Sequence, residues 1–542
     1  MSVEPNDLDD SQAESISLNR KLVEWLLACD LRRIRNLDEL FSAIAQQIAE
    51  IDRRLVAVVR QVLGSQKFRQ LESSYRSIYG LIATSGSSDS TIRNMPLSRN
   101  VNVFVLDISA EELESDLNAN SHRQTWVYDK LFRKRFDYLI GEQNIQLEDY
   151  SAVYPFSLMI VDFDFGLNQV KLKSSFEKSM QLGLDSIRKL ARVGEECFCM
   201  FLVSLAPNFF GESIKSFSQL ENVIDVKSIL RQPTYSQWNG FRRQECSRMI
   251  GLSMPRVLVR TPYRNYRMRA TVDAEGNKSP ATGIVFDEHE GFGGTEQFLW
   301  GRSAFAVAQP IIRSFKLYDW FSDVSGVDRD PKQLATEDSD LEPGYDGGLI
   351  WSLPKTYFQT DSAGVASYPP VEIIISEREE AIYSSIGLIP LFSINQSYYV
   401  ATLSCQSAQQ VRPMSTGDAT SNLRLSSMFN YMLCVCRMAH RLKIETRSQI
   451  GKSVGPETVQ DHMQEWLMKH SSGQNRGFEQ KMIKPFFDEA TGFFVDEDVT
   501  DPGRYNCTVR LCPHHKYDSG RTRVIFEPVT LQMQLNANED GG

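Results

Sequence analysis

The stretch from 379 to 453 constrains the fold most, because it reads as two short strands followed by a long amphipathic helix. Residues 388–393 and 398–404 are apolar runs separated by a turn-prone Asn-Gln pair. Thr420 or Ser421 can cap the helix that follows. Its apolar side chains recur at alternating steps of three and four, which makes one stripe: Leu425, Met428, Met432, Val435, Ala439 and Leu442. No reactive residue in the segment is placed for chemistry, so the pattern predicts a packed scaffold.

Size and charge exclude several classes of protein. The chain has 542 residues, enough for two or more domains with a sizeable core. A net charge of -10 argues against a general nucleic-acid binder, which would carry a basic excess. No apolar run approaches the roughly 18 residues of a membrane span, and the acidic N-terminus lacks the features of a secretory signal. We therefore expect the chain to remain in the cytoplasm.

The nine cysteines follow no repeating framework. Cys197 and Cys199 lie in an apolar, strand-like run, and Cys434 and Cys436 lie in the apolar helix described above. Buried free thiols in a reducing compartment explain both pairs better than disulfides or a metal site.

Helical patterns open the chain. A helix is predicted over 18–34, with Leu22, Trp25 and Leu26 among its apolar residues. A second helix follows, capped by Asn36 or Asp38 and ended by Gly64. Its apolar residues recur at helical spacing over about six turns: Leu40, Ile44, Ile48, Ile51, Leu55, Val58 and Val62. Residues 1–64 are therefore predicted to form an N-terminal helical arm and linker.

Strand and helix patterns alternate from residue 66 onward. Strands are predicted over 101–109, 157–165 and 197–206, and a helix over 174–192 lies between the last two. This alternation favours a mixed or partly parallel sheet with helices packed on it. A further helix over 300–320 contains Pro310, and the acidic, turn-rich segment 323–348 is predicted to be an exposed loop. The fold class is thus mixed α/β (α+β), with an α/β region over 65–378 and a C-terminal region over 379–538.

The C-terminal region ends in a predicted β-hairpin. Apolar residues alternate with polar ones in both strands: Tyr505, Cys507, Val509 and Leu511 in the first, and Val529, Leu531, Met533 and Leu535 in the second. Each strand therefore has one apolar face. Because an isolated two-stranded hairpin is marginal in water, we expect this one to pair with other strands, in its own chain or in a neighbour.

Two carboxylates are the strongest candidates for chemistry. Asp162 and Asp164 project from one face of a predicted strand, about 7 Å apart along it, and paired carboxylates can hold a metal ion or act in acid–base catalysis. The alternative is a strand end whose carboxylates reach solvent or nearby helix N-termini. The tripeptide Asp164-Phe165-Gly166 also occurs in protein kinases, but the other kinase motifs are missing from this sequence.

Two further motifs give only a weak indication of chemistry. Cys507, Cys512, His514 and His515 are metal-ligand residue types, but the two cysteines belong to opposite faces of one strand. The run Gly451-Lys452-Ser453 lacks the earlier glycine of a phosphate-binding loop and ends a helix instead of opening one.

Two basic clusters leave two interpretations open. One is the short run of Arg133, Lys134 and Arg135; the other is spread along one segment and contains Arg256, Arg260, Arg264, Arg267 and Arg269. Either cluster can be a solvated face, or it can make an electrostatic contact with an acidic protein partner.

Several long, collinear motifs resemble one family. The segment from Phe68 resembles a family motif of the form F-x-x-L-E-x-x-W-R-G-L, with Tyr75 in place of the tryptophan and Ser77 in place of the glycine. YPFSLMIVDFDF resembles a family strand, with Val161 in place of its glycine. FLWGRSAFAVAQPIIRSF, GGLIWSLPKTYFQTD and IGLIPLFSINQSYYVATLSCQSAQ resemble further family segments, the last ending in the Gln406-Ser407 pair. Taken together, the chain resembles the large subunit of the contractile sheath of type VI secretion systems.

This resemblance implies a fold and a role. The fold would be that of phage-tail-like contractile sheaths, and the chain would be a structural subunit with no enzymatic activity and no cofactor. It would pair with a small sheath subunit, assemble in stacked hexameric rings around an inner tube on a baseplate, and drive secretion by contraction. The family also implies strand exchange between neighbours and docking of a recycling AAA+ ATPase on an N-terminal helix.

The implied roles select two sets of candidate partner-binding residues. Leu22, Trp25 and Leu26 are the candidates for the recycling ATPase. The candidates for strand exchange are Tyr505, Val509, Leu511, Val529, Leu531 and Met533. Two alternatives stay open at this point: a metal-dependent enzyme that uses Asp162 and Asp164, and the sheath of an atypical contractile injection system.

Overall fold

The computed structural model describes residues 36–86, 101–134, 155–167, 176, 179–222, 225–263, 266–267, 285–288, 297–318, 321, 324–327, 347–354, 356–357, 367–394, 399–412, 423–424, 426–449, 456–469, 487–497, 505–513 and 529–535. These residues fall into two compact units, one within Met1–Arg69 and Pro262–Gln297, the other within Gln70–Thr261 and Phe298–Gly542. No helix in this part of the chain combines the length and apolar content needed to cross a bilayer.

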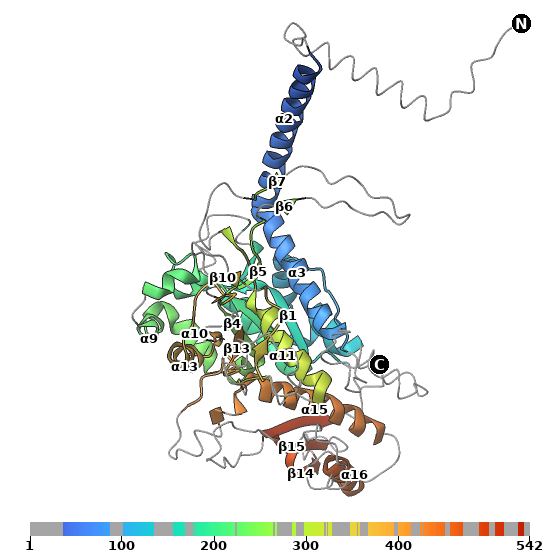
Figure 1. Cartoon of the computed structure of the whole chain (residues 1–542). Coiled ribbons are helices and arrows are strands. Elements are labelled where there is room, and N and C mark those ends of the chain that lie inside the picture. The colour runs from blue at the N-terminus through green and yellow to red at the C-terminus, as the bar shows by residue number, and fades with distance from the viewer. Residues whose placement is uncertain are drawn as a thin grey trace, which may run out of the picture. The chain divides into compact units, whose positions relative to one another are not determined.

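A seven-stranded sheet forms the centre of the larger unit (Figure 1). Five strands run parallel in the order β2-β1-β3-β4-β12, and β13 and β9 complete the sheet in antiparallel pairs. The bounds are β1 Leu158–Phe165, β2 Gln181–Leu182, β3 Met200–Leu205, β4 Ile250–Met254, β9 Leu349–Ile350, β12 Ile389–Ser393 and β13 Val400–Thr402. The mixed sheet predicted from the alternation of strands and helices is confirmed.

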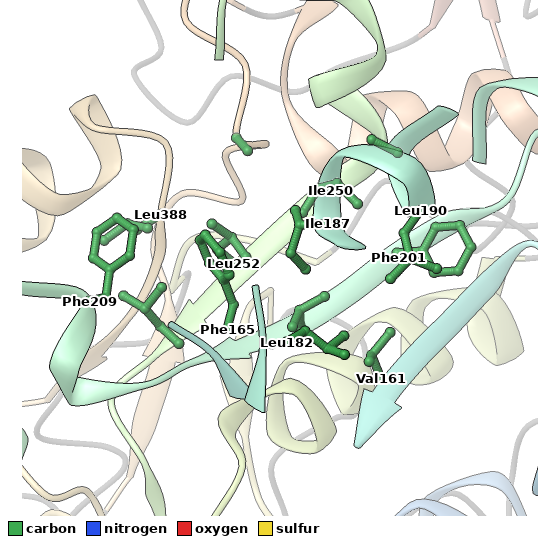
Figure 2. Packing of buried hydrophobic residues seen from close by; sticks show 14 of the residues in the cluster. Val161, Phe165, Leu182, Ile187, Leu190, Phe201, Phe209, Ile250, Leu252 and Leu388 are labelled. Carbon is green, nitrogen blue, oxygen red and sulfur yellow. The ribbon is translucent and has the colours of Figure 1, made fainter. Parts of the chain in front are cut away.

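The fully buried strand β3 separates two hydrophobic cores. Met200 and Leu202 belong to one core with residues of α11 (Ser303–Tyr318) and α15 (Phe429–Gln449). Phe201, Val203 and Leu205 belong to the other core with residues of α8 (Leu184–Cys197). Since successive side chains of a strand point to opposite faces, the continuous apolar run of β3 is what a sheet covered on both sides requires. Figure 2 shows the α8 side, where Ile187 and Leu190 pack among the side chains of the strands.

The turn after α8 brings this helix close to β3. Phe198 ends the helix in the left-handed conformation (φ 52°), and the Cys199 amide donates to the Gly194 carbonyl at 3.1 Å. A Cβ atom on Gly194 would lie 2.7 Å from the Cys199 carbonyl oxygen, so only glycine fits this approach.

Shorter helices and strands surround the sheet. The helices are α3 Gln66–Gly86, α4 Ala110–Leu117, α5 Trp126–Tyr128, α9 Val226–Leu230, α10 Ser236–Arg242, α13 Glu377–Ser385 and α16 Pro456–Lys469. Short 3₁₀ helices are η3 His122–Gln124, η7 Pro207–Phe210, η8 Phe217–Asn222, η9 Pro233–Tyr235 and η10 Glu245–Met249, and η4 Asp129–Arg133 is a short π-helix. Two-stranded pairs form between β5 Val257–Arg260 and β8 Leu299–Gly301, and between β10 Thr356–Tyr357 and β11 Ser367–Tyr368.

Three elements differ from the sequence prediction. The segment 101–109 is assigned no strand, and it pairs with none of the described strands. The helix predicted over 174–192 is α8, which begins only at Leu184, because residues 181–182 form β2 beside β1. The long helix of the C-terminal region begins at Phe429, because Met428 bridges Gln406 and the Phe429 amide donates to the Cys405 carbonyl at 2.7 Å. Thr420, Ser421 and Leu425, predicted to cap and begin that helix, lie outside the described residues.

A separate three-stranded sheet lies near the C-terminus. Its order is β14-β15-β16, with bounds Phe487–Glu497, Tyr505–Pro513 and Val529–Leu535, and both pairings are antiparallel. The strand β15 is therefore central, and α16 lies against β14.

The smaller unit is built around one long helix. It contains α2 (Leu37–Gly64), β6 (Tyr266–Arg267) and β7 (Val285–Phe286). Arg60 of α2 donates from Nε to the Asp287 carbonyl at 2.7 Å, next to β7. Asn36 occupies the N-cap position of α2, and none of the helix's own side chains is buried.

Candidate functional site

An arginine bridges the two carboxylates that the sequence singles out. Asp162 and Asp164 occupy alternate positions of β1, and Arg302 lies between β8 and α11. Arg302 donates from Nη1 to Asp162 Oδ1 at 2.6 Å and from Nε to Asp164 Oδ1 at 2.9 Å. Its side chain is only 5% exposed. The guanidinium therefore occupies the space between the carboxylates that a metal ion would need.

Burial and charge act in opposite directions on Asp164. Desolvation by burial raises its pKa above the usual value, whereas the nearby Arg302 and Arg256 guanidinium groups lower it. Among the described residues, no three His, Cys, Asp or Glu side chains are grouped so that they could hold a metal ion. The geometry of Asp162 and Asp164 is that of an internal ion cluster, and it gives no support to the metal-dependent alternative.

The same cluster fixes the start of α11 on the sheet. Ser303 Oγ donates to Ser253 Oγ of β4 at 2.9 Å, and the Ala304 amide donates to Ser204 Oγ of β3 at 2.9 Å. Phe165 of the Asp-Phe-Gly tripeptide is fully buried, with its ring 5.4 Å from that of Trp238. The phenylalanine of this tripeptide is therefore part of the hydrophobic core.

Two arginines of the basic segment pair with carboxylates of their own chain; the side chain of Arg260 is 9% exposed and that of Arg256 is 31% exposed. Arg256 donates to both carboxylate oxygens of the buried Glu372, at 2.6 and 2.7 Å, and Glu372 also accepts from Ser216 Oγ at 2.5 Å. Arg260 donates to both oxygens of Glu72 in α3, at 2.5 and 2.8 Å. For these two arginines, both interpretations from the sequence were wrong, because each side chain pairs with a carboxylate of its own chain. The partners lie 116 and 188 residues away in the chain, so no local pattern indicates them.

The remaining basic residues divide in two groups. Arg133, 3.6 Å from Asp129 in η4, and Lys134 are both exposed, which fits a solvated face. Arg135, Arg264 and Arg269 lie outside the described residues, and of Arg267 only the backbone, in β6, is described.

Six cysteines are free and buried, namely Cys197, Cys199, Cys246, Cys405, Cys434 and Cys436, as predicted for the pairs Cys197/Cys199 and Cys434/Cys436. Burial raises the pKa of Cys436 to about 12, so its thiol stays protonated and unreactive near neutral pH. His440 of α15 lies in the same region, with Nε2 2.8 Å from the Cys197 carbonyl. Burial lowers the pKa of His440 to about 4.

An open polar pocket of about 520 Å³ lies between α8 and η10. Two of its three acidic side chains have cationic neighbours: Arg248 is 3.8 Å from Glu195, and Arg123 is 2.8 Å from Glu196. Desolvation by burial raises the pKa of Glu195 and lowers that of His122. Arg192 and Glu245 also line the pocket, and this mixed set of charges indicates no specific ligand.

The sequence-predicted partner residues have two different outcomes. Leu22, Trp25 and Leu26 lie outside the described residues. Tyr505, Val509 and Leu511 are in the central strand β15, and Val529, Leu531 and Met533 are in the outer strand β16. The register pairs Val509 with Leu531 and Leu511 with Val529, so the candidates in β15 lie beside those in β16.

Exposed apolar side chains form surfaces that the sequence analysis missed. Val103, Phe104, Val105 and Leu106 are exposed in the extended segment 101–109. On α3, Leu71, Tyr75, Tyr79 and Ile82 are exposed at helical spacing. On α2, the exposed apolar residues are Leu37, Phe41, Ile48, Ile51, Leu55, Val58, Val59 and Val62. The apolar pattern of these segments is visible in the sequence. It predicts a helix or strand, but it does not show whether other parts of the chain bury the apolar face of that element.

Comparison with known proteins places these features in a family. Residues 45–409 match the family model described as EvpB/VC_A0108, tail sheath N-terminal domain. Residues 418–527 match the model described as EvpB/VC_A0108, tail sheath gpW/gp25-like domain. The chain is also 27% identical over 482 residues to the type VI secretion system sheath protein TssC1 of Pseudomonas aeruginosa, covering 89% of this chain and 84% of that protein.

Proposed function

The chain belongs to the EvpB/VC_A0108 tail sheath family, and from this premise we propose how it acts as a structural subunit of a contractile type VI secretion sheath. It pairs with a small sheath subunit, and the pairs polymerise as stacked hexameric rings around an inner tube, starting from a baseplate in the bacterial cytoplasm. Contraction of the sheath drives the inner tube forward and delivers effectors. The observation that carries the proposal is the match to two tail sheath domains in collinear order, over 45–409 and 418–527.

The internal ion pairs support a core that moves as one rigid body. Arg302, Arg256 and Arg260 each join segments more than a hundred residues apart in the chain. Arg256 and Arg260 each bind one carboxylate through two hydrogen bonds, and such bidentate pairs fix the orientation of the elements that they connect. Contraction would then reorient whole subunits, a type of transition in which the contacts between rigid bodies change while their interiors do not.

The C-terminal sheet supports a link that persists during such a reorientation. An outer strand can accept a strand from a neighbouring chain through main-chain hydrogen bonds. Because β15 is central, the outer strands β16 and β14 are the candidates for this exchange. The helix α16 lies against β14, whereas α15 contacts β15 and β16 together, as a helix on the face of the sheet does. We therefore assign the exchange to β16, with Val529, Leu531 and Met533 in the strand that receives the neighbour.

A pair of proline variants tests this assignment. Successive backbone N–H groups of a strand point to opposite edges, so Leu531→Pro and Gln532→Pro remove donors on opposite sides of β16. One variant damages the pairing with β15; the other leaves that pairing intact and blocks only the outer edge. Each is co-expressed with the small subunit, checked for thermal stability, and examined by negative-stain electron microscopy. We expect the thermally stable variant of the two to form no tubes; normal tubes from that variant would contradict the assignment.

Three further assignments remain part of the proposal. The arm and linker are residues 1–64, followed by regions over 65–378 and 379–538. Leu22, Trp25 and Leu26 would dock a recycling AAA+ ATPase, and unchanged ATPase binding after deletion of 1–34 would contradict this. The acidic segment 323–348 was predicted to be exposed, but both of its ends are buried: Val324 is 1% exposed, and the Gly348 amide donates to the Gly326 carbonyl at 2.8 Å. The part between these ends would face the outside of the sheath, and a crosslink from it to the inner tube would contradict that.

A further inference from the structure

One edge of the seven-stranded sheet is closed by the chain itself. Next to β9, the Gly348 carbonyl accepts from the Thr402 amide of β13, so the carbonyls of Gly347 and Leu349 point away from the sheet. Arg313 of α11 donates to both of these carbonyls, at 2.6 and 2.7 Å. The chain thus supplies donors to the outer carbonyls of its terminal strand.

The opposite edge of the sheet is open along most of β1. This strand pairs with β3 on one side, but on the other side β2 reaches only Asp164 and Phe165. The outer edge of residues 158–163 therefore pairs with no strand of the described chain. Burial of the side chains agrees, because all of β3 is buried, whereas six of the eight residues of β1 are only half-buried. We call this part of β1 the open edge.

The segment 101–109 approaches the open edge with the alternation of a strand. Val101 packs against the core of α11 and α15, to which β1 also contributes side chains. Ile108 packs against the core of α8, and the Phe104 ring lies 5.4 Å from that of Phe156, which packs against the same core. Odd-numbered and even-numbered side chains of the segment therefore lie on opposite faces of the sheet, as they do in β1.

The middle of this segment also lacks a strand partner. Within the described part of the chain, the backbone groups of Val103, Val105 and Leu106 make no hydrogen bond, and 101–109 pairs neither with β1 nor with another strand. Residues 103–106 are apolar at every position, a composition that belongs to a strand covered on both faces. Val105 is nevertheless 68% exposed. Two neighbouring stretches of backbone, both in phase with the two cores, thus lack a partner.

A single strand placed beside β1 satisfies both stretches. We propose that the open edge receives one extended strand of a different polypeptide, which pairs with residues 158–163 of β1 and, on its other side, with 103–106. Main-chain hydrogen bonds then hold the strand, as in other cases of strand addition to a sheet edge. The sheet would gain a strand in its core, at a place distinct from the exchange assigned to β16.

The two cores define the chemistry of the added strand. Both continue past β1, so the strand needs apolar side chains on both faces over about four residues, and no proline at its centre. A second copy offers its own open edge, but two such edges paired together form an isologous contact with a two-fold axis. In a sheath whose copies all point the same way along the tube, this contact is excluded. That step rests on the proposed function.

Photo-crosslinking in the assembled sheath identifies the added strand. The full-length chain carries p-benzoyl-phenylalanine in place of Val105, is co-expressed with the small subunit and is irradiated, and crosslinked peptides are sequenced by mass spectrometry. We expect a crosslink to a segment of a different polypeptide that is apolar on both strand faces. Crosslinks only to this chain, within one copy or between two copies, overturn the proposal, and so does the absence of any crosslink in tubes that have formed.

Hydrogen exchange measures the pairing in the parent chain and in three variants. Val105→Lys places a charge where the strand would pack, and Val105→Ile keeps the position apolar. Ser115→Lys places the same charge at an exposed position of α4, outside the proposed contact. Because Val105 is 68% exposed and Ser115 is exposed, all three variants should keep the melting temperature of the free parent chain.

We expect amide exchange at 103–106 and 158–162 to slow about 100-fold when the free parent chain enters the sheath. Val105→Ile and Ser115→Lys should retain this protection within about threefold, and Val105→Lys should lose most of it. Unchanged exchange in formed tubes overturns the proposal, and so does equal loss in Ser115→Lys, because protection would not depend on the segment. If no tubes form, the proposed function fails, whereas the strand contact is judged by the crosslink in the soluble complex.

Discussion

Arg302 Nη1 lies 2.6 Å from Asp162 Oδ1, although the two residues are 140 positions apart in the chain. This contact joins the start of α11 to β1. The guanidinium also offsets the charge of the two carboxylates that alternate positions of β1 place on one face. The most suggestive chemical motif of the sequence is thus part of the packing between a helix and the central sheet.

Removing the arginine should destabilise the chain strongly. Arg302→Ala leaves two carboxylates without their cation, and loss of one partner from a buried pair costs about 3–5 kcal/mol. We expect a decrease in the free energy of unfolding near the lower figure, since Asp162 is 38% exposed. Urea unfolding measures it. The triple variant with Arg302→Met, Asp162→Asn and Asp164→Asn should recover most of the loss, and no recovery would mean that the ion cluster is not the cause.

Divalent metal ions should not stabilise the parent chain. The guanidinium of Arg302 occupies the space between the carboxylates, so adding Mg²⁺ or Mn²⁺ should leave the melting temperature unchanged. The control is the chain with Asp162→Ala and Asp164→Ala. A metal-induced rise in melting temperature that disappears in this control would instead support the metal-dependent alternative.

Acid should destabilise the chain through His440. Burial depresses the pKa of this imidazole to about 4, against roughly 6.5 in an unfolded chain. The unfolded state therefore binds the proton first, and the stabilisation present above pH 6.5 is lost as the pH falls toward 4. Linkage gives about 3 kcal/mol for the full effect. Urea midpoints at several pH values in this range measure the slope.

His440→Leu is the matched variant for this slope. It lacks the titrating group, so its stability should depend less on pH between 6.5 and 4 than that of the parent chain. It should also be less stable at neutral pH, because the Cys197 carbonyl loses its hydrogen-bond donor, at about 1–3 kcal/mol. An identical slope in both proteins would assign the acid sensitivity to other groups.

Two glycines in helices should respond oppositely to alanine. At Gly194, a Cβ would lie 2.7 Å from a backbone oxygen, so Gly194→Ala should destabilise by about 1–3 kcal/mol. At Gly240, in α10, nothing lies within 4 Å of the added atom, so Gly240→Ala should stabilise by about 0.5–1 kcal/mol. Thermal or urea unfolding distinguishes them, and equal effects would show that the turn after α8 tolerates a side chain.

The sequence determined the elements whose pattern is local. The apolar run at Met200–Leu205 is a fully buried strand, the spacing that ends at Gly64 is a long helix, and residues 388–404 contain the hairpin of β12 and β13. Hydrophobic periodicity reports which face of an element avoids water, and this depends only on neighbouring residues. The collinear motifs also indicated the sheath family.

Only the tertiary structure decided which distant residues meet. From the sequence, Arg256 and Arg260 are interpreted as surface charges, but in the folded chain they pair with Glu372 and Glu72. Partners so distant in the chain leave no local pattern in the sequence. The segment 101–109 has the composition of a strand but pairs with no described strand, since a strand forms only where another edge supplies its hydrogen bonds. The apolar stripe of α2 was likewise visible in the sequence, but its exposure was not, because burial depends on what the rest of the chain covers.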